Sequence, residues 1–227
     1  MTADGGFLSG KFANPSNKNA SAMLVSGYEK WLKGAADPKP IPTNRLDLFG
    51  GEPLQKGGIK LEVAYRDFPR GDVERPGSAR LPNPYNLGWF DFSPEDAQNF
   101  FAEPGSKKSL PKSLFSKFAC DKLKDSVRGQ MNGWKTGELK DGELISEFIS
   151  ENGSEKTYRL NGFAKFSTGD QSYEPTLHGI VKVDAASGEF IEFQLVASGQ
   201  RTGKGGANGR ETDLGPAPMG VGFALYK

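Results

Sequence analysis

The chain is poor in the two side chains that most often build metal and redox sites. Its 227 residues include one cysteine, Cys120, and one histidine, His178. A single cysteine excludes an intramolecular disulfide, and the two counts together exclude most zinc sites and any acid–base scheme that needs two histidines. We therefore expect no metal site and no cofactor.

Long apolar runs and an excess of one charge are also missing. No apolar segment approaches the roughly 18 residues that span a bilayer, and the formal net charge is only +1. A balanced charge gives no overall field toward nucleic acid, which disfavours that class of partner. The first six residues lack the basic and apolar regions of a secretory signal. The sequence predicts a soluble protein, either cytoplasmic or extracytoplasmic after removal of a signal peptide.

Glycine and proline, in contrast, are abundant, with 30 and 15 residues, which favours many turns over many helices. The stretch 155–199 shows the clearest pattern of the chain. Apolar and polar residues alternate there in three runs, which are separated by Gly169-Asp170 and by Ala185–Gly188. Alternation with a period of two, interrupted by turn residues, predicts three consecutive antiparallel strands.

Further elements are predicted on both sides of this meander. Strands are expected at 45–49, 59–65, 87–92, 144–149 and 219–225, and helices at 21–33, 94–101 and 111–127. Ser93 and Pro94 are typical of a helix N-terminus. Gly220, Gly222 and Ala224 leave one face of the last strand almost without side chains, which indicates strong bending or the close approach of another element.

Together these elements predict a mainly β protein with one antiparallel sheet of about eight strands. We expect a curved sheet or an incomplete β-barrel with two or three packed helices, and a β-sandwich is the alternative. Residues 1–19 are predicted to form an irregular arm, and 20–227 a single domain.

Candidate ligand-binding residues lie in two loops that the sheet would hold, 66–89 and 199–215. Aromatic residues in the first loop suit ligand stacking, and charged residues in the glycine-rich second loop suit an anion or a saccharide. The spacing of these glycines matches neither phosphate-loop template. The candidates are Tyr85, Trp89, Arg201, Lys204, Arg210 and Asp213.

Two neighbouring segments carry opposite charge. The stretch 105–128 has a net charge of +5, and the stretch 138–155 has a net charge of −5. A basic helix at 107–128 could lie on an anionic membrane or a partner, but pairing with the acidic segment is the simpler interpretation.

No nucleophile and base stand at a recognised spacing, and neither His178 nor Cys120 belongs to a catalytic motif. We therefore expect a non-catalytic β-rich domain that binds a small-molecule, saccharide or protein ligand, or that serves as an assembly module. Two alternatives stay open: a carboxylate-dependent saccharide hydrolase or lyase, and a peripheral membrane or partner-docking protein that uses the basic helix 107–128. The sequence leaves enzymatic activity uncertain and leans against it.

Overall fold

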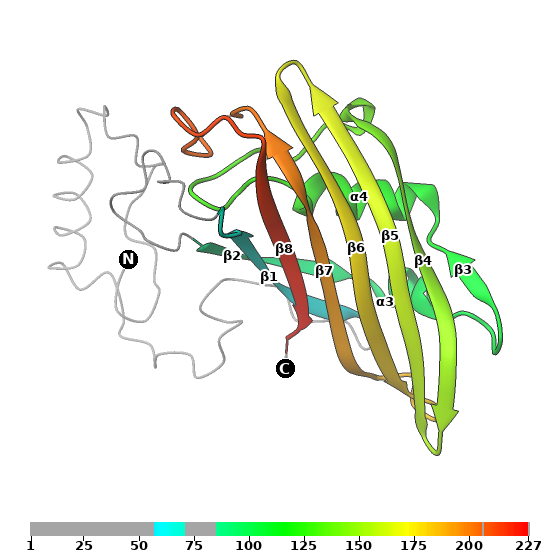
Figure 1. The fold of residues 1–227 in the computed structure, drawn as a ribbon. Coiled ribbons are helices and arrows are strands. Elements are labelled where there is room, and N and C mark those ends of the chain that lie inside the picture. Colours follow the sequence, from blue (N-terminus) through cyan, green and yellow to red (C-terminus); the bar gives the residue numbers. More distant parts are fainter. Residues whose placement is uncertain (1–56, 71–84, 206, 227) are drawn as a thin grey trace, which may run out of the picture. The chain divides into compact units, whose positions relative to one another are not determined.

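The computed structural model describes residues 57–70, 85–205 and 207–226. Within these ranges the strands form one antiparallel sheet with the order β2-β1-β8-β7-β6-β5-β4-β3 (Figure 1). The edge strands β2 and β3 do not pair with each other, so the sheet is unclosed. The predicted mainly β fold with a curved sheet of eight strands is confirmed. The alternative of a β-sandwich is wrong, because the described strands belong to one sheet.

The strands are β1 (Ile59–Asp67), β2 (Tyr85–Phe92), β3 (Lys107–Ser109), β4 (Leu139–Asn152), β5 (Glu155–Thr168), β6 (Gln171–Asp184), β7 (Phe190–Thr202) and β8 (Ala217–Leu225). Two α-helices, α3 (Pro94–Ala97) and α4 (Lys112–Lys122), and two 3-10 turns, η1 (Gln98–Phe100) and η2 (Thr136–Glu138), complete the described elements. None of these helices has the length and apolar character needed to span a bilayer.

The predicted meander forms the middle of the sheet. Strands β5, β6 and β7 pair with their neighbours in sequence, and β4 joins them through the hairpin at Asn152-Gly153. Gly153 has a φ of 61°, which a glycine adopts without strain. Alternate residues of each strand are buried, as the period of two predicts.

Strand β1 pairs with two strands that are far from each other in the sequence, β2 and β8. This strand lies between β2 and β8, so that Val63 faces Gly88 on one side and Phe223 on the other. Gly220 of β8 faces the ring of Phe68, which would overlap a Cβ atom at that position. The close approach predicted for the last strand therefore occurs at Gly220.

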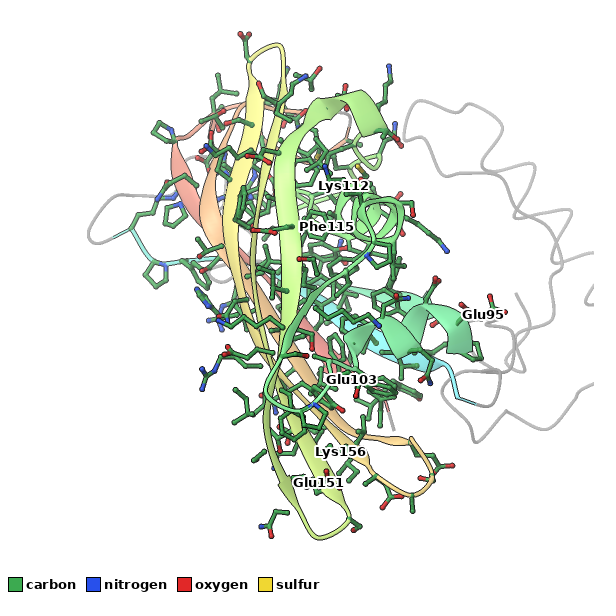
Figure 2. The ribbon with its side chains drawn as sticks, turned by 90° about the vertical axis from the view of Figure 1, so that its right-hand side faces the viewer. Glu95, Glu103, Lys112, Phe115, Glu151 and Lys156 are labelled. Carbon is green, nitrogen blue, oxygen red and sulfur yellow. The ribbon has the colours of Figure 1, made fainter. Side chains whose placement is uncertain are left out.

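Helices α3 and α4 lie on the same side of the sheet, as Figure 2 shows in side view. Phe118 of α4 is fully buried and contacts Phe90 of β2 and Phe223 of β8, with ring centroids 5.3 and 5.0 Å apart. The Phe115 ring packs against the backbone of Gly142 in β4. Helix α4 thus covers the inner face, where the apolar core lies.

Ser93 caps α3 as predicted, because its hydroxyl accepts a hydrogen bond of 3.1 Å from Asp96 N. Helix α4 is shorter than predicted and ends at Lys122 rather than near Val127. The carbonyl of Leu123 accepts a hydrogen bond from Trp134 Nε1 at 2.8 Å, which replaces a further helical turn. A continuous basic helix over 107–128 is therefore wrong, since this range contains β3, α4 and an irregular segment.

Several predictions concern residues outside the described ranges. These are the arm 1–19 and its boundary with the domain, the helix at 21–33, the strand at 45–49, and positions 71–84 of the long loop.

Candidate functional site

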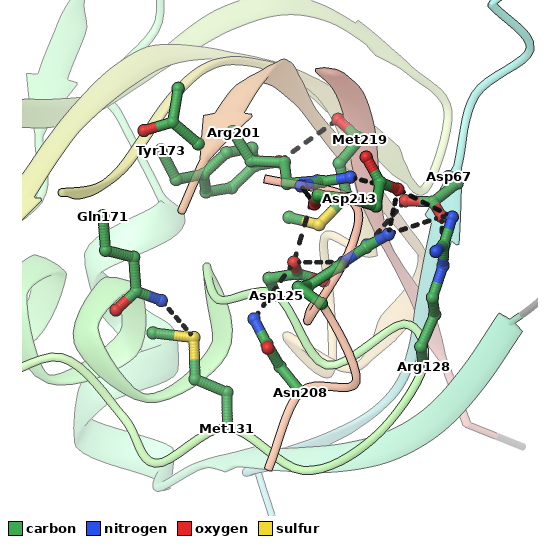
Figure 3. Close-up of polar contacts among 12 residues, drawn as sticks. Asp67, Asp125, Arg128, Met131, Gln171, Tyr173, Arg201, Asn208, Asp213 and Met219 are labelled. Carbon is green, nitrogen blue, oxygen red and sulfur yellow. Dashed lines mark hydrogen bonds and ion pairs between the residues drawn. The ribbon is translucent and has the colours of Figure 1, made fainter. Parts of the chain in front are cut away.

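Seven charged side chains meet where β1 and β7 end and β8 begins. Figure 3 shows Asp67, Asp125, Arg128, Arg201 and Asp213 among them. They come from the end of β1, the segment after α4, the end of β7 and the connection from β7 to β8. We call them the charge cluster, and its members are Asp67, Arg70, Asp125, Arg128, Arg201, Arg210 and Asp213.

Arg210 occupies the centre of the charge cluster and has no exposed surface. Its Nε and Nη2 atoms donate to the two carboxylate oxygens of Asp125 at 2.7 and 2.8 Å. Its Nη1 and Nη2 atoms also donate to Asp67, at 2.9 and 2.7 Å. One guanidinium group thus fixes β1, the segment after α4 and the β7–β8 connection to one another.

Asp213 binds the remaining arginines. Arg70 donates two hydrogen bonds to its carboxylate, at 2.8 and 2.6 Å, and Arg201 Nη2 lies 2.7 Å from the same group. Arg128 Nη2 lies 2.9 Å from both Asp213 and Asp67. Burial acts to raise the pKa of Asp213, but these arginines outweigh it and hold that pKa far below its usual range.

The charge cluster has a structural role because its charged atoms bind one another. Buried ions are stable only when each is paired, and breaking such a pair costs about 3–5 kcal/mol. Within the charge cluster, four guanidinium groups face three carboxylates. Burial, followed by repulsion from Arg210, lowers the pKa of Arg201. The cluster therefore fixes loops in place, and little of its surface is left for a ligand.

The structure brings together three of the predicted ligand-binding residues, Arg201, Arg210 and Asp213, but buries them. Lys204, from the same loop, is exposed. Tyr85 and Trp89 lie on one face of β2: Tyr85 is 68% exposed, and Trp89 packs edge-on against Tyr226 at 4.9 Å. The roles of these residues in ligand binding stay predictions.

The two single reactive residues lie apart from the charge cluster. His178 is exposed on β6, and its Nδ1 lies 3.1 Å from Asn161 Oδ1. Cys120 is buried in α4, and burial raises the pKa of its thiol. Within the described ranges no three His, Cys, Asp or Glu side chains gather in a way that could hold a metal ion.

A pocket of about 300 Å³ opens beside the charge cluster, between β1, the start of β2 and the segment after α4. We call it the Tyr65 pocket. Its wall is formed by Tyr65, Asn86, Leu87, Gly88, Lys122, Lys124, Ser126, Gly129, Gln130, Met131 and Asn132. Most of these residues are polar, and the volume lies at the lower end of the range for small-molecule sites.

Tyr65 lines this pocket and is almost completely buried. It is 3% exposed, and its hydroxyl lies beside Gly88. Among the residues that the structure describes, none forms a hydrogen bond with this hydroxyl. Burial, and to a smaller degree the charge of Asp121, raises the tyrosine pKa strongly, so the hydroxyl keeps its proton and can donate it to an acceptor.

The charge cluster positions one wall of the Tyr65 pocket. Asp125 and Arg128 belong to the cluster, whereas Ser126 and Gly129 between them line the pocket. Asn86 holds this wall against β2, because its Nδ2 donates to Ser126 O at 2.9 Å and to Gly129 O at 3.2 Å. The pocket wall is thus fixed from both sides.

Two lysines approach the pocket from the end of α4. The side chains of Lys122 and Lys124 are each 16% exposed, and both lie near the carboxylate of Asp121, at 3.0 and 3.8 Å. Burial lowers the pKa of Lys124. The Lys122 ammonium also lies over the Phe90 ring, 5.8 Å from its centroid, a position that favours a cation.

The sequence alone does not indicate this pocket. Tyr65 lies in the predicted strand 59–65, and Lys122 and Lys124 lie in the predicted basic helix 107–128. No local signal in the sequence places the three together, because the pocket forms only when β1 packs against the end of α4. The charge pattern did indicate that the end of α4 is basic.

Comparison with protein-family models, with curated proteins and with solved structures finds no match for this chain.

Proposed function

We propose that the protein is a non-catalytic binding domain whose small polar ligand occupies the Tyr65 pocket. The observation that supports this proposal is the Tyr65 hydroxyl in the pocket wall, which has no hydrogen-bond partner among the described residues. A hydrogen bond to such a donor contributes roughly 0.5–1.5 kcal/mol net. A ligand that accepts a hydrogen bond from Tyr65 would gain that contribution.

The surroundings of Tyr65 also suit a ligand. The pocket is concave, and the segment that forms its wall is held by Asn86 and by the charge cluster. A wall that is fixed before binding loses little conformational entropy when the ligand arrives. Polar groups that converge on a preformed pocket are typical of ligand sites.

The other two hypotheses have less support. The three carboxylates of the charge cluster are each bound by arginine, so they are poorly suited to acid–base work on a saccharide. Lys107 and Lys117 lie 3.3 and 3.7 Å from Glu147 and Asp96, which leaves fewer basic groups for a membrane or a partner. These pairs favour the pocket over the basic segment.

A ligand screen with two tyrosine variants tests the proposal. We would measure the thermal shift of the protein with a panel of small polar compounds, and then the dissociation constant of each hit by calorimetry. In Tyr65→Phe, which removes only the hydroxyl, we expect about fivefold to tenfold weaker binding with an unchanged or slightly higher midpoint of unfolding.

Tyr173→Phe is the matched control. Tyr173 is as buried as Tyr65, but its hydroxyl lies within hydrogen-bond reach of Ala197 O and Met219 O, at 3.3 and 3.4 Å. This variant should lose stability and keep its affinity for the ligand. A panel without any hit, or a hit that binds Tyr65→Phe as tightly as the unchanged protein, would overturn the proposal.

A further inference from the structure

We infer that the Tyr65 pocket selects a small anion, a carboxylate or a phosphate, which Lys122 and Lys124 bind together with Tyr65. This inference rests on the proposed function and adds the chemical class of the ligand. It follows from the charge of the pocket wall and from the kind of hydrogen-bonding group that remains without a partner.

The charge of the wall is unbalanced. Lys122 and Lys124 share one carboxylate, that of Asp121, at 3.0 and 3.8 Å. Asp125, the next acid along the chain, is held by Arg210 in the charge cluster and does not compensate these lysines. Among the described residues, one positive charge therefore stays in excess at the pocket, and both lysine side chains are mostly buried.

An anion would relieve this arrangement. Burial disfavours the charged form of a lysine, whereas a negative partner within about 4–6 Å favours it. Asp121 itself is 49% exposed, so much of its charge is screened by water. A second anion inside the pocket would supply the missing partner in a place that water screens less.

The hydrogen-bonding groups of the wall agree with an anionic ligand. The Tyr65 hydroxyl and the two ammonium groups are donors, while the donor group of Asn86 is already used by the carbonyls of Ser126 and Gly129. An ionised carboxylate offers only acceptors, and an ionised phosphate offers mainly acceptors. Charge-assisted hydrogen bonds of this kind are about twice as strong as neutral ones.

Lysines at the end of a helix have a second explanation, because cations there stabilise the helix dipole. Two of the carbonyls at the end of α4 already accept hydrogen bonds, however. Cys120 O accepts from Trp134 N at 2.8 Å, and Lys122 O accepts from Lys124 N at 2.9 Å. A role at the helix end requires one cation and no ligand, so binding experiments separate it from anion recognition.

The test compares anions with a neutral compound on the full chain. We would titrate succinate, inorganic phosphate, glucose 6-phosphate and glucose into the protein by calorimetry, at low and at high sodium chloride. We expect at least one anion to bind, glucose to bind more weakly or not at all, and high salt to reduce the affinity for the anion. The succinate and phosphate arms distinguish the two sources of negative charge.

Lysine variants complete the test. Lys124→Gln and Lys122→Gln should each weaken binding of the anion by about tenfold, as expected for the loss of one charge-assisted hydrogen bond. Lys165→Gln removes the same charge from an exposed position of β5 and should leave binding unchanged. If one pocket variant does not fold, the other variant and the salt series of the unchanged protein still decide the outcome.

The two ways of failing are distinguishable. If glucose binds in a manner that depends on Tyr65 and no anion binds, the inference is wrong and the proposed binding function stands. If an anion binds both lysine variants as tightly as it binds the unchanged protein, the inference is also wrong. If neither anions nor neutral compounds bind, both the inference and the proposed function fall.

Discussion

Arg210 and Asp125 form a buried bidentate ion pair, in which Nε and Nη2 of the arginine lie 2.7 and 2.8 Å from the two carboxylate oxygens. The pair joins the β7–β8 connection to the segment after α4, which forms a wall of the Tyr65 pocket. The charge cluster is therefore the support of the candidate site, and its loss should affect both stability and binding.

Replacing Arg210 by methionine should lower the free energy of unfolding by about 3–5 kcal/mol, because it removes the cation that binds both carboxylate oxygens of the buried Asp125. Chemical denaturation at neutral pH would measure this loss. Lys204→Met, in the same loop but at an exposed position, should change stability by less than about 0.5 kcal/mol. Equal midpoints for the two variants would contradict a structural role for the charge cluster.

Acid should destabilise the protein through Asp213 and Asp67, whose pKa values the arginines hold below the usual range. When the pKa of a carboxyl group is lower in the folded than in the unfolded state, the group stabilises the folded state. This stabilisation is complete only at pH values above the unfolded pKa, which is about 3.9. That contribution is lost as the pH falls below this value toward the folded pKa.

Unfolding measured between neutral pH and about pH 2 would follow this loss. Asp213→Asn should be less stable at neutral pH and should lose less stability on acidification than the unchanged protein. Glu174→Gln, which removes an exposed carboxylate of β6, serves as the control. An unaltered pH profile in Asp213→Asn would show that Asp213 does not carry the acid sensitivity.

At Gly129 the pocket wall packs closely against Ala207 of the β7–β8 connection. A Cβ atom at this position would overlap the carbonyl oxygen of Ala207, and the adjacent Gln130 forms a two-way backbone bridge with Ala207. Gly129→Ala should therefore push the wall away, lower stability by about 1–3 kcal/mol and weaken ligand binding.

Gly137→Ala is the control for this variant, because a Cβ atom at Gly137 would have no neighbour within 4 Å. Its stability and its affinity should match those of the unchanged protein. Denaturation and calorimetry of the two variants side by side check the prediction, and normal binding by Gly129→Ala would mean that the wall does not need its observed position.

The central part of the fold was predictable because its signal is local. In 155–199 each strand has one buried face, so a period of two in the sequence reports directly on the structure. Leu160 and Phe166 are buried as that period requires. The position of β1 between β2 and β8 was not predictable in this way, because pairing between distant strands leaves no local pattern.

The end of α4 shows a different limit. Val127 is buried and apolar, which extends the helical pattern, yet it lies in an irregular segment. The hydrogen bond from Trp134 to Leu123 O ends the helix, and Trp134 is a distant residue that no helix signal includes.

The candidate site was predictable only in part. The sequence identified the charges Arg201, Arg210 and Asp213, but it could not show that Asp67 and Asp125 come from other segments to neutralise them. A charge in a glycine-rich loop suits ligand binding and a buried ion pair equally well, and only the three-dimensional structure shows that these charges form buried ion pairs. The Tyr65 pocket depends in the same way on contacts between segments.

The most direct test of the binding site is the mapping of ligand contacts by nuclear magnetic resonance. Backbone amide signals would be recorded while the best ligand of the panel is added to the isotope-labelled protein. We predict that the largest shifts fall at Tyr65, at 86–88 and at 122–132, which form the Tyr65 pocket. Shifts confined to other residues, such as 203–205 or the outer face of β5 to β7, would contradict the account.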